Sequence, residues 1–213
     1  MKEYSYDLIF KKLISEIPIN KSENVYGITF IAGPGYGKST IANIISKKLN
    51  LYITANDKIR RLYDELGFDN VLYENDIKKM ANDRTVYLLQ NKTSHIIDAN
   101  MEFFWEMASD NYQKYNAKLI FIELVCDKNE ILKRIEKRSQ NYGKNDNLSR
   151  AGKDDFYKYL ELKKEKGIPK DKIFECMKAI DDVCVDAPVR IGDIIIADVV
   201  GTGINVVATR NID

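Results

Sequence analysis

The sequence predicts an α/β protein of three layers, with helices on both faces of a mostly parallel sheet. Short apolar strand segments alternate with amphipathic helical segments along residues 25–166. A glycine-rich turn joins the first of these strands to a helix. The segment 118–125, KLIFIELV, is apolar almost throughout, which indicates a strand buried on both faces. Because strands and helices alternate, we expect right-handed βαβ units.

The predicted elements follow from hydrophobic periodicity and from the residues that stop each segment. An N-terminal amphipathic helix over 4–17 ends at Pro18. Strands are predicted over the short apolar segments 25–32, 51–55, 95–99 and 118–125. Helices are predicted where apolar residues recur every three or four positions, over 41–49, 57–66, 73–90, 103–115, 127–139 and 154–166.

Two units are predicted, a body over 1–167 and a small α+β extension over 168–213. Within the body, residues 127–150 form the predicted lid region. In the extension we expect one helix and two short strands, over 173–180, 189–196 and 205–208. Residues 193–197, DIIIA, are one candidate for a strand that completes the sheet of the body. The alternative is an independent module that docks, regulates or dimerises.

Composition excludes several classes of protein. The chain has 213 residues, of which 45% are hydrophobic and 31% charged, as in a globular protein with an ample core. No apolar run approaches the roughly 20 residues that cross a bilayer, so we expect a cytoplasmic protein without a membrane partner. The cysteines show no C-x-x-C spacing and are expected to be reduced core residues: Cys126, Cys176 and Cys184.

The net charge of +1 conceals an uneven distribution. Residues 171–213 contain 4 Lys and Arg against 8 Asp and Glu, which leaves 29 against 24 in the first 170 residues. A mildly basic body suits a small anionic substrate. It is weak for broad nucleic-acid binding, which needs a concentrated basic face, although a short oligonucleotide end is not excluded.

The glycine-rich turn carries the strongest motif. Residues 32–39 read AGPGYGKS and fit the P-loop pattern [AG]-x-x-x-x-G-K-[ST] between a strand and a helix. In such a loop, backbone N–H groups and a helix N-terminus bind phosphate, the lysine reaches the β and γ phosphates, and the serine binds Mg²⁺. We therefore expect ATP and Mg²⁺ as ligands, with nucleotide-binding residues Gly33, Pro34, Gly35, Tyr36, Gly37, Lys38, Ser39 and Thr40. A glycine-rich turn with an incidental lysine is less favoured, because motif and context agree.

From residue 25 to 165 the chain resembles the small P-loop kinases of the polynucleotide 5′-hydroxyl kinase and zeta-toxin-like group, often described as AAA-type ATP-binding proteins. Besides the P-loop, the resemblance rests on the D-x-x-R of Asp57 and Arg60, on IIDAN at 96–100, and on LKR at 132–134 with Arg138. It implies the P-loop NTPase fold and transfer of the ATP γ-phosphate to a hydroxyl.

The resemblance also implies roles for particular residues. Asp57 would accept the proton of the acceptor hydroxyl, and Arg60 would hold an acceptor anion. Arg134 and Arg138 would neutralise charge on the transferring phosphoryl group, and we expect Arg150 to join them when the lid closes. The alternatives are a helix cap for Asp57 and structural salt bridges for the lid arginines.

Patterns in the sequence bear on these roles independently. Around the helix 57–66, Ile59, Leu62, Tyr63 and Leu66 share one face and leave Asp57 and Arg60 on the other. Asp98 ends an apolar strand, as a second carboxylate near Mg²⁺ or the acceptor should, although any polar residue leaving a buried strand looks the same. His95 is expected to be structural, because no second histidine exists to share a metal.

Five aromatic side chains are candidates either for stacking a base or for the core, and core positions are the commoner use on helices: Phe103, Phe104, Trp105, Tyr157 and Tyr159.

The extension has a resemblance of its own, to the C-terminal part of a small domain of unknown function encoded near FAD-dependent glycerol-3-phosphate dehydrogenases. It rests on IPKDKIFE, APVRIGD, GTG and ATR, at 168–175, 187–193, 201–203 and 208–210. The half of that family whose cysteine pairs are expected to hold a metal or an iron–sulfur cluster has no counterpart here, so no metal function carries over.

Three classes of function therefore compete. A kinase ranks first, with a nucleotide, a nucleic-acid end or a small metabolite as its acceptor. An ATPase or switch ranks second, because Ala99 follows Asp98 where AAA motors have the glutamate that activates water. A non-catalytic nucleotide-binding adaptor ranks third, with residues 168–213 as the surface for a protein partner.

Overall fold

A six-stranded sheet forms the centre of the protein. The computed structural model describes residues 4–69, 71–140, 151–168, 197–198 and 205–206. The strands are β1 (Tyr26–Ile31), β2 (Tyr52–Ala55), β3 (His95–Asn100), β4 (Lys118–Val125), β5 (Ala197–Asp198) and β6 (Asn205–Val206). Their order in the sheet is β2-β3-β1-β4-β6-β5, and the first four are parallel. The predicted α/β class with a mostly parallel sheet is confirmed.

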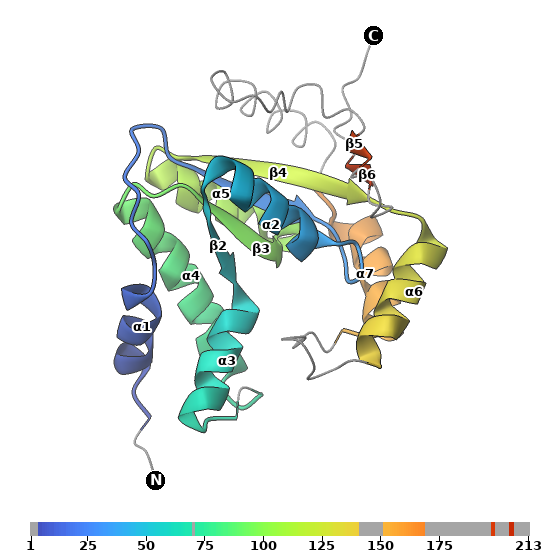
Figure 1. Ribbon diagram of the computed structural model, residues 1–213, viewed down its shortest axis with the longest axis horizontal. Coiled ribbons are helices and arrows are strands. Elements are labelled where there is room, and N and C mark those ends of the chain that lie inside the picture. The colour runs from blue at the N-terminus through green and yellow to red at the C-terminus, as the bar shows by residue number, and fades with distance from the viewer. Residues whose placement is uncertain (1–3, 70, 141–150, 169–196, 199–204, 207–213) are drawn as a thin grey trace.

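Seven α-helices surround the described strands (Figure 1). They are α1 (Tyr6–Ser15), α2 (Lys38–Leu49), α3 (Asn56–Leu66), α4 (Glu74–Gln90), α5 (Trp105–Lys114), α6 (Lys128–Ser139) and α7 (Lys153–Lys166). All of them fall on segments that hydrophobic periodicity predicts. Some boundaries differ: α2 begins at Lys38 and not at residue 41, and the helix expected from residue 103 is divided into a 3₁₀ turn, η1 (Glu102–Phe104), and α5.

The central strand β1 is buried on both faces. Ile28 and Phe30 pack with Ile41 of α2 on one face. Ile31 packs with Tyr112 of α5 on the other face, where the end of α4 also contributes. This alternation produces the three layers that the sequence predicts, with α2 on one face of the sheet and α5 on the other (Figure 1).

A separate apolar cluster joins α1 to α3 and α4. Ile9 and Leu13 of α1 pack with Ile59 and Tyr63 of α3 and with Met80 of α4. The apolar face predicted for residues 57–66 is therefore the buried one, so the other face of α3 remains available to the site.

The lid region contributes its own small core. Ile131 and Ile135 of α6 pack with Phe156 of α7, and Tyr36 of the glycine-rich loop lies against them. Residues 141–150, which include Arg150, lie outside the described part of the chain.

Two short strands of the extension join the sheet of the body. β6 pairs antiparallel with β4, with Leu124 opposite Val206, while β5 pairs only with β6. Among the described residues, β6 is therefore the strand beside β4. Of the candidate segment 193–197 only Ala197 is described, in β5, and residues 193–196 lie outside the described part of the chain. The segments 173–180 and 189–196 lie outside the described residues.

No helix formed by the described residues is long and apolar enough to cross a membrane. Cys126 is half-buried beside the lid cluster, and burial raises the pKa of its thiol. Cys176 and Cys184 are outside the described ranges.

Candidate active site

The glycine-rich loop connects β1 to the first turn of α2. Gly35 and Gly37 have φ angles of +83° and +92°, in the left-handed region that glycine adopts without steric cost. Gly37 is the residue immediately before α2, so the loop turns directly into the N-terminus of that helix. The unpaired N–H groups of the first turn and the helix dipole both favour a bound anion at this place.

Helices α6 and α7 pack against this loop. The rings of Tyr36 and Tyr159 lie edge to face with their centroids 5.8 Å apart. The centroid of the Phe156 ring is 6.4 Å from that of Tyr36. A β-carbon on Gly35 would be 2.9 Å from a methyl carbon of Ile131. The shape of the loop is thus determined by packing against α6 and α7 as well as by its glycines.

Lys38 bends back over the loop that precedes it. Its Nζ donates hydrogen bonds to the carbonyl oxygens of Ala32 at 3.1 Å and Gly33 at 2.8 Å. Burial lowers the pKa of Lys38 to about 8; the charge of Arg138 lowers it further and that of Asp98 opposes the change. A nearby phosphate would raise this pKa again, because an opposite charge favours the charged form.

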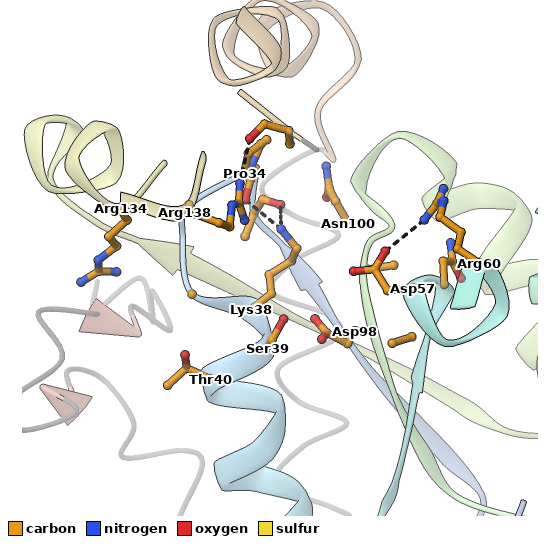
Figure 2. A pocket seen from close by; sticks show the side chains of 18 residues that line it. Pro34, Lys38, Ser39, Thr40, Asp57, Arg60, Asp98, Asn100, Arg134 and Arg138 are labelled. Carbon is orange, nitrogen blue, oxygen red and sulfur yellow. Dashed lines mark hydrogen bonds and ion pairs between the residues drawn. The ribbon is translucent and has the colours of Figure 1, made fainter. Parts of the chain in front are cut away.

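Ser39 and Asp98 face each other beside Lys38 (Figure 2). Asp98 comes from the carboxyl end of β3, and its carboxylate lies beside the Ser39 side chain (Figure 2). Burial raises the pKa of Asp98 and the Asp57 charge adds to this, while Ser39 and Lys38 oppose it. One hydroxyl and one carboxylate suit Mg²⁺, which takes few protein ligands and completes its shell with phosphates and water. The described residues contain no larger cluster of potential metal ligands.

Asp57 and Arg60 lie on the opposite side of Lys38 from the lid arginines in Figure 2. Ala55 at the end of β2 is in register with Asp98, which brings the start of α3 beside the end of β3. Arg60 donates to Asp57 Oδ1 at 3.2 Å and to both carboxylate oxygens of Glu74 at 3.1 and 3.3 Å. Ala55, and not Asp57, occupies the N-cap position of α3, so the helix-cap alternative for Asp57 is not what the structure shows.

The lid arginines project from the same helix that supplies Ile131 and Ile135 to the lid core. Arg134 Nε donates to Glu130 Oε1 at 2.9 Å, so the salt bridge considered as an alternative is present. Arg138 donates to the Ala151 carbonyl oxygen at 3.0 Å. Burial lowers the pKa of Arg138, and the charge of Asp57 opposes that shift.

These groups surround one cavity of about 480 Å³. Nearly all the candidate residues from the sequence line it: Gly33, Pro34, Gly35, Gly37, Lys38, Ser39, Thr40, Asp57, Arg60, Asp98, Arg134 and Arg138. Tyr36 does not, because its ring packs into the lid cluster. The sequence did not single out two amides in the wall, Asn56 and Asn100.

The sequence also did not reveal a hydrogen-bonded network of Glu102, Glu123, Tyr159 and Lys163 beside α7. Tyr159 donates its hydroxyl to Glu102 Oε2 at 2.9 Å, and Glu102 is 1% exposed. Lys163 Nζ lies 2.7 Å from Glu123 and 3.9 Å from Glu102. Burial raises the pKa of Glu102. Tyr159 is therefore a core residue, the commoner of its two expected uses, while Phe104 is 58% exposed.

His95 is structural, as expected. It is fully buried, with Nδ1 3.0 Å from the Thr93 carbonyl oxygen and Nε2 2.7 Å from the Tyr112 hydroxyl. Because Nδ1 faces a carbonyl, it carries the proton, and Nε2 accepts from the tyrosine. Burial lowers the pKa of His95 to about 4.

Most of the chain matches a known protein family. Residues 28–179 match the family described as AAA domain. The chain belongs to this AAA domain family. Residues 151–210 also match a family described as a protein of unknown function (DUF1667). Both family resemblances seen in the sequence are thereby confirmed. No curated protein matches the chain.

Solved structures show what fold this AAA domain has. A "putative kinase" from Chloroflexus aurantiacus J-10-fl matches with a TM-score of 0.50 and 19% identity, over 69% of this chain and 82% of the other. A chain of the Pnkp1/Rnl/Hen1 RNA repair complex matches with a TM-score of 0.53 and 25% identity over 71% of this chain; the AAA domain protein spans half of its length. A chain of the PezAT toxin–antitoxin system of Streptococcus pneumoniae matches with a TM-score of 0.51 and 14% identity, over 87% of this chain and 77% of the other. The fold is that of P-loop kinases.

Proposed function

We propose that this AAA domain protein is a kinase that transfers the γ-phosphate of ATP to a hydroxyl of a nucleotide, a nucleic-acid end or a small metabolite. The observation that carries the proposal is the composition of the 480 Å³ cavity. The phosphate loop with Lys38 forms its centre, Asp57 lies on one side and Arg138 on the other. A site that only bound nucleotide would need the loop alone, whereas this one adds a carboxylate that can act as a base and arginines that can stabilise the transferring group.

The residues divide the work as follows. Lys38 and the loop amides hold the β and γ phosphates in line with the acceptor. Ser39 and Asp98 would hold Mg²⁺, which neutralises phosphate charge when bound. As the acceptor oxygen bonds to the γ phosphorus and the bond to the β-phosphate oxygen breaks, Asp57 takes the hydroxyl proton.

The cations have two different tasks in this scheme. Arg60 keeps the Asp57 carboxylate oriented through their 3.2 Å contact. This role takes the place of the acceptor-anion contact that the family resemblance implies, because Asp57 and Glu74 already pair with Arg60. Arg134 and Arg138 stabilise the negative charge of the phosphoryl group in transit. The neighbours described as a kinase and as part of an RNA repair complex support this class of reaction and leave the acceptor open.

The test is transfer of label from γ-labelled ATP with Mg²⁺, in the presence of 5′-hydroxyl oligonucleotides, nucleosides, nucleotide sugars and a metabolite extract. We expect label on one acceptor, abolished by Lys38→Ala and reduced about 10²–10⁴-fold by Asp57→Asn. Glu65→Gln is the matched control, because Glu65 lies exposed on the same helix and outside the cavity.

Two other outcomes would contradict the proposal. Label released only as phosphate, at a rate that Asp57→Asn leaves unchanged, would indicate an ATPase or switch. Nucleotide binding without any turnover would indicate an adaptor.

A further inference from the structure

A second cavity, of about 330 Å³, adjoins the phosphate-loop cavity. Residues of α3, α4 and α5 line it, and the two cavities share Asn56, Arg60, Ala99 and Asn100 in their walls. A molecule in the second cavity therefore lies next to the groups assigned to phosphoryl transfer. Its volume falls in the range of small-molecule sites.

The wall formed by η1, α5 and the residues just before them carries most of the apolar side chains of the cavity, beside the amides of Asn100 and Asn111. It contains Met101, Phe104, Met107 and Ala108, with Ile97 of β3 beneath. Phe104 is 58% exposed and Met107 is 52% exposed. Large apolar side chains held at the edge of a cavity favour a ligand with a ring or another apolar portion.

The wall formed by α4 contains one buried cation, Arg84. It is 1% exposed and donates to the Ala55 carbonyl oxygen at 3.0 Å and to Asn56 Oδ1 at 3.4 Å. Its Nε has no hydrogen-bond partner, and no carboxylate of the described residues forms an ion pair with it. Arg60 in the same cavity differs, because Asp57 and Glu74 both neutralise it.

A buried guanidinium without a carboxylate is costly for the free protein. A ligand carboxylate or phosphate would compensate it with two parallel hydrogen bonds. The amides in the walls add neutral hydrogen-bonding groups, among them Asn82, which accepts from Asn111 at 3.2 Å.

We propose that this second cavity binds the phosphoryl acceptor, and that the acceptor is a small hydroxyl compound with an apolar ring and one anionic group that pairs with Arg84. The acceptor role rests on the proposed kinase function. A polynucleotide end fits less well, because it brings a phosphate with each residue and needs a row of unmatched cations.

Binding tests the proposal separately from catalysis. Titration calorimetry on the full chain compares two pairs of an anionic and a neutral probe, 3-(hydroxymethyl)benzoate with its amide and uridine 3′-phosphate with uridine. A 5′-hydroxyl oligothymidylate is measured beside them. We expect the anionic member of at least one small pair to bind about tenfold or more tightly than the neutral member. The pair that shows the difference identifies the anion as carboxylate or phosphate.

Two variants make the test specific. Arg84→Met should abolish the preference for the anionic probe. If that variant does not fold, Met107→Asp decides, because it places a negative charge at the exposed edge of the cavity and should weaken the anionic probe about tenfold. Ser109→Asp is its matched control, with the same charge on the same helix but outside the cavity wall; it should bind the probe as the wild type does.

The outcomes separate the two proposals. Label transferred to the oligothymidylate at a rate unaffected by Arg84→Met and Met107→Asp would support the kinase and overturn the small anionic acceptor. Anion-dependent binding without label transfer to any acceptor would support the cavity as an anion site and overturn the kinase. Equal affinity for both members of each pair would overturn the inference.

Discussion

The ring of Tyr159 lies so close to Gly33 that a β-carbon on the glycine would come within 2.3 Å of Tyr159 Cδ1. The tyrosine is 4% exposed, and its hydroxyl is hydrogen-bonded to Glu102. The ring cannot swing aside without leaving a buried carboxylate short of a partner. The start of the phosphate loop is therefore held in place by the helix that follows the lid.

This contact predicts the effect of Gly33→Ala. The added methyl group must displace either the loop or the Tyr159 ring, so the variant should lose about 1–3 kcal/mol of unfolding free energy and bind ATP more weakly. Chemical denaturation and nucleotide titration measure the two effects. Gly152→Ala is the control, because a β-carbon there meets nothing closer than 3.9 Å and the change should cost less than about 1 kcal/mol. Equal effects of the two substitutions would contradict the packing account.

Features that depend on residues close together in the chain could be predicted from the sequence, whereas contacts between distant residues could not. The loop from Gly33 to Thr40 and the two faces of α3 are local patterns, and the structure has them where the sequence puts them. The contacts of Tyr159 with Glu102 and of Arg84 with Ala55 join residues 57 and 29 positions apart. No periodicity records such pairings, because they arise only when separate elements pack.

The same limit applies to the edge of the sheet. DIIIA has the composition of a strand, and of its residues only Ala197 is described, in β5; the described residues of the extension that pair with β4 are Asn205 and Val206. Backbone hydrogen bonds carry no side-chain pattern, so composition alone does not choose between candidate edge strands.

Lys38 makes both stability and nucleotide binding depend on pH. Burial lowers its pKa from 10.5 to about 8. Between these values the unfolded chain holds the proton more tightly, so the contribution of Lys38 to stability rises as pH rises from 8 towards 10.5. Bound phosphates favour charged Lys38, so ATP affinity should fall as pH rises through 8. Titrations on both sides of pH 8 should show this fall in the wild type and not in Lys38→Met; parallel profiles would show that another group is responsible.

His95 predicts a loss of stability in weak acid. Its pKa is lowered from 6.5 to about 4, because burial removes the water that would stabilise the charged ring. As pH falls from 6.5 to 4 the unfolded chain takes up the proton first, so unfolding free energy should decrease by about 1.4 kcal/mol per pH unit from this group. Denaturation of the wild type and of His95→Gln across that window isolates the contribution, since the carboxylates titrate in both. A wild-type slope no steeper than that of His95→Gln would contradict the assignment.

Arg138 is expected to act on the reaction and not on nucleotide binding. It lines the phosphate-loop cavity, and its charge lowers the pKa of Lys38. Because negative charge on the γ-phosphoryl group must be compensated during transfer, Arg138→Ala should slow transfer about a thousandfold and change ATP affinity little. Single-turnover transfer and ATP titration separate the two quantities. Lys133→Ala removes an exposed cation from the same helix and should leave both unchanged. A loss of ATP affinity as large as the loss of rate would instead make Arg138 a ground-state contact of the phosphates, because only an interaction strengthened in the transition state lowers the rate alone.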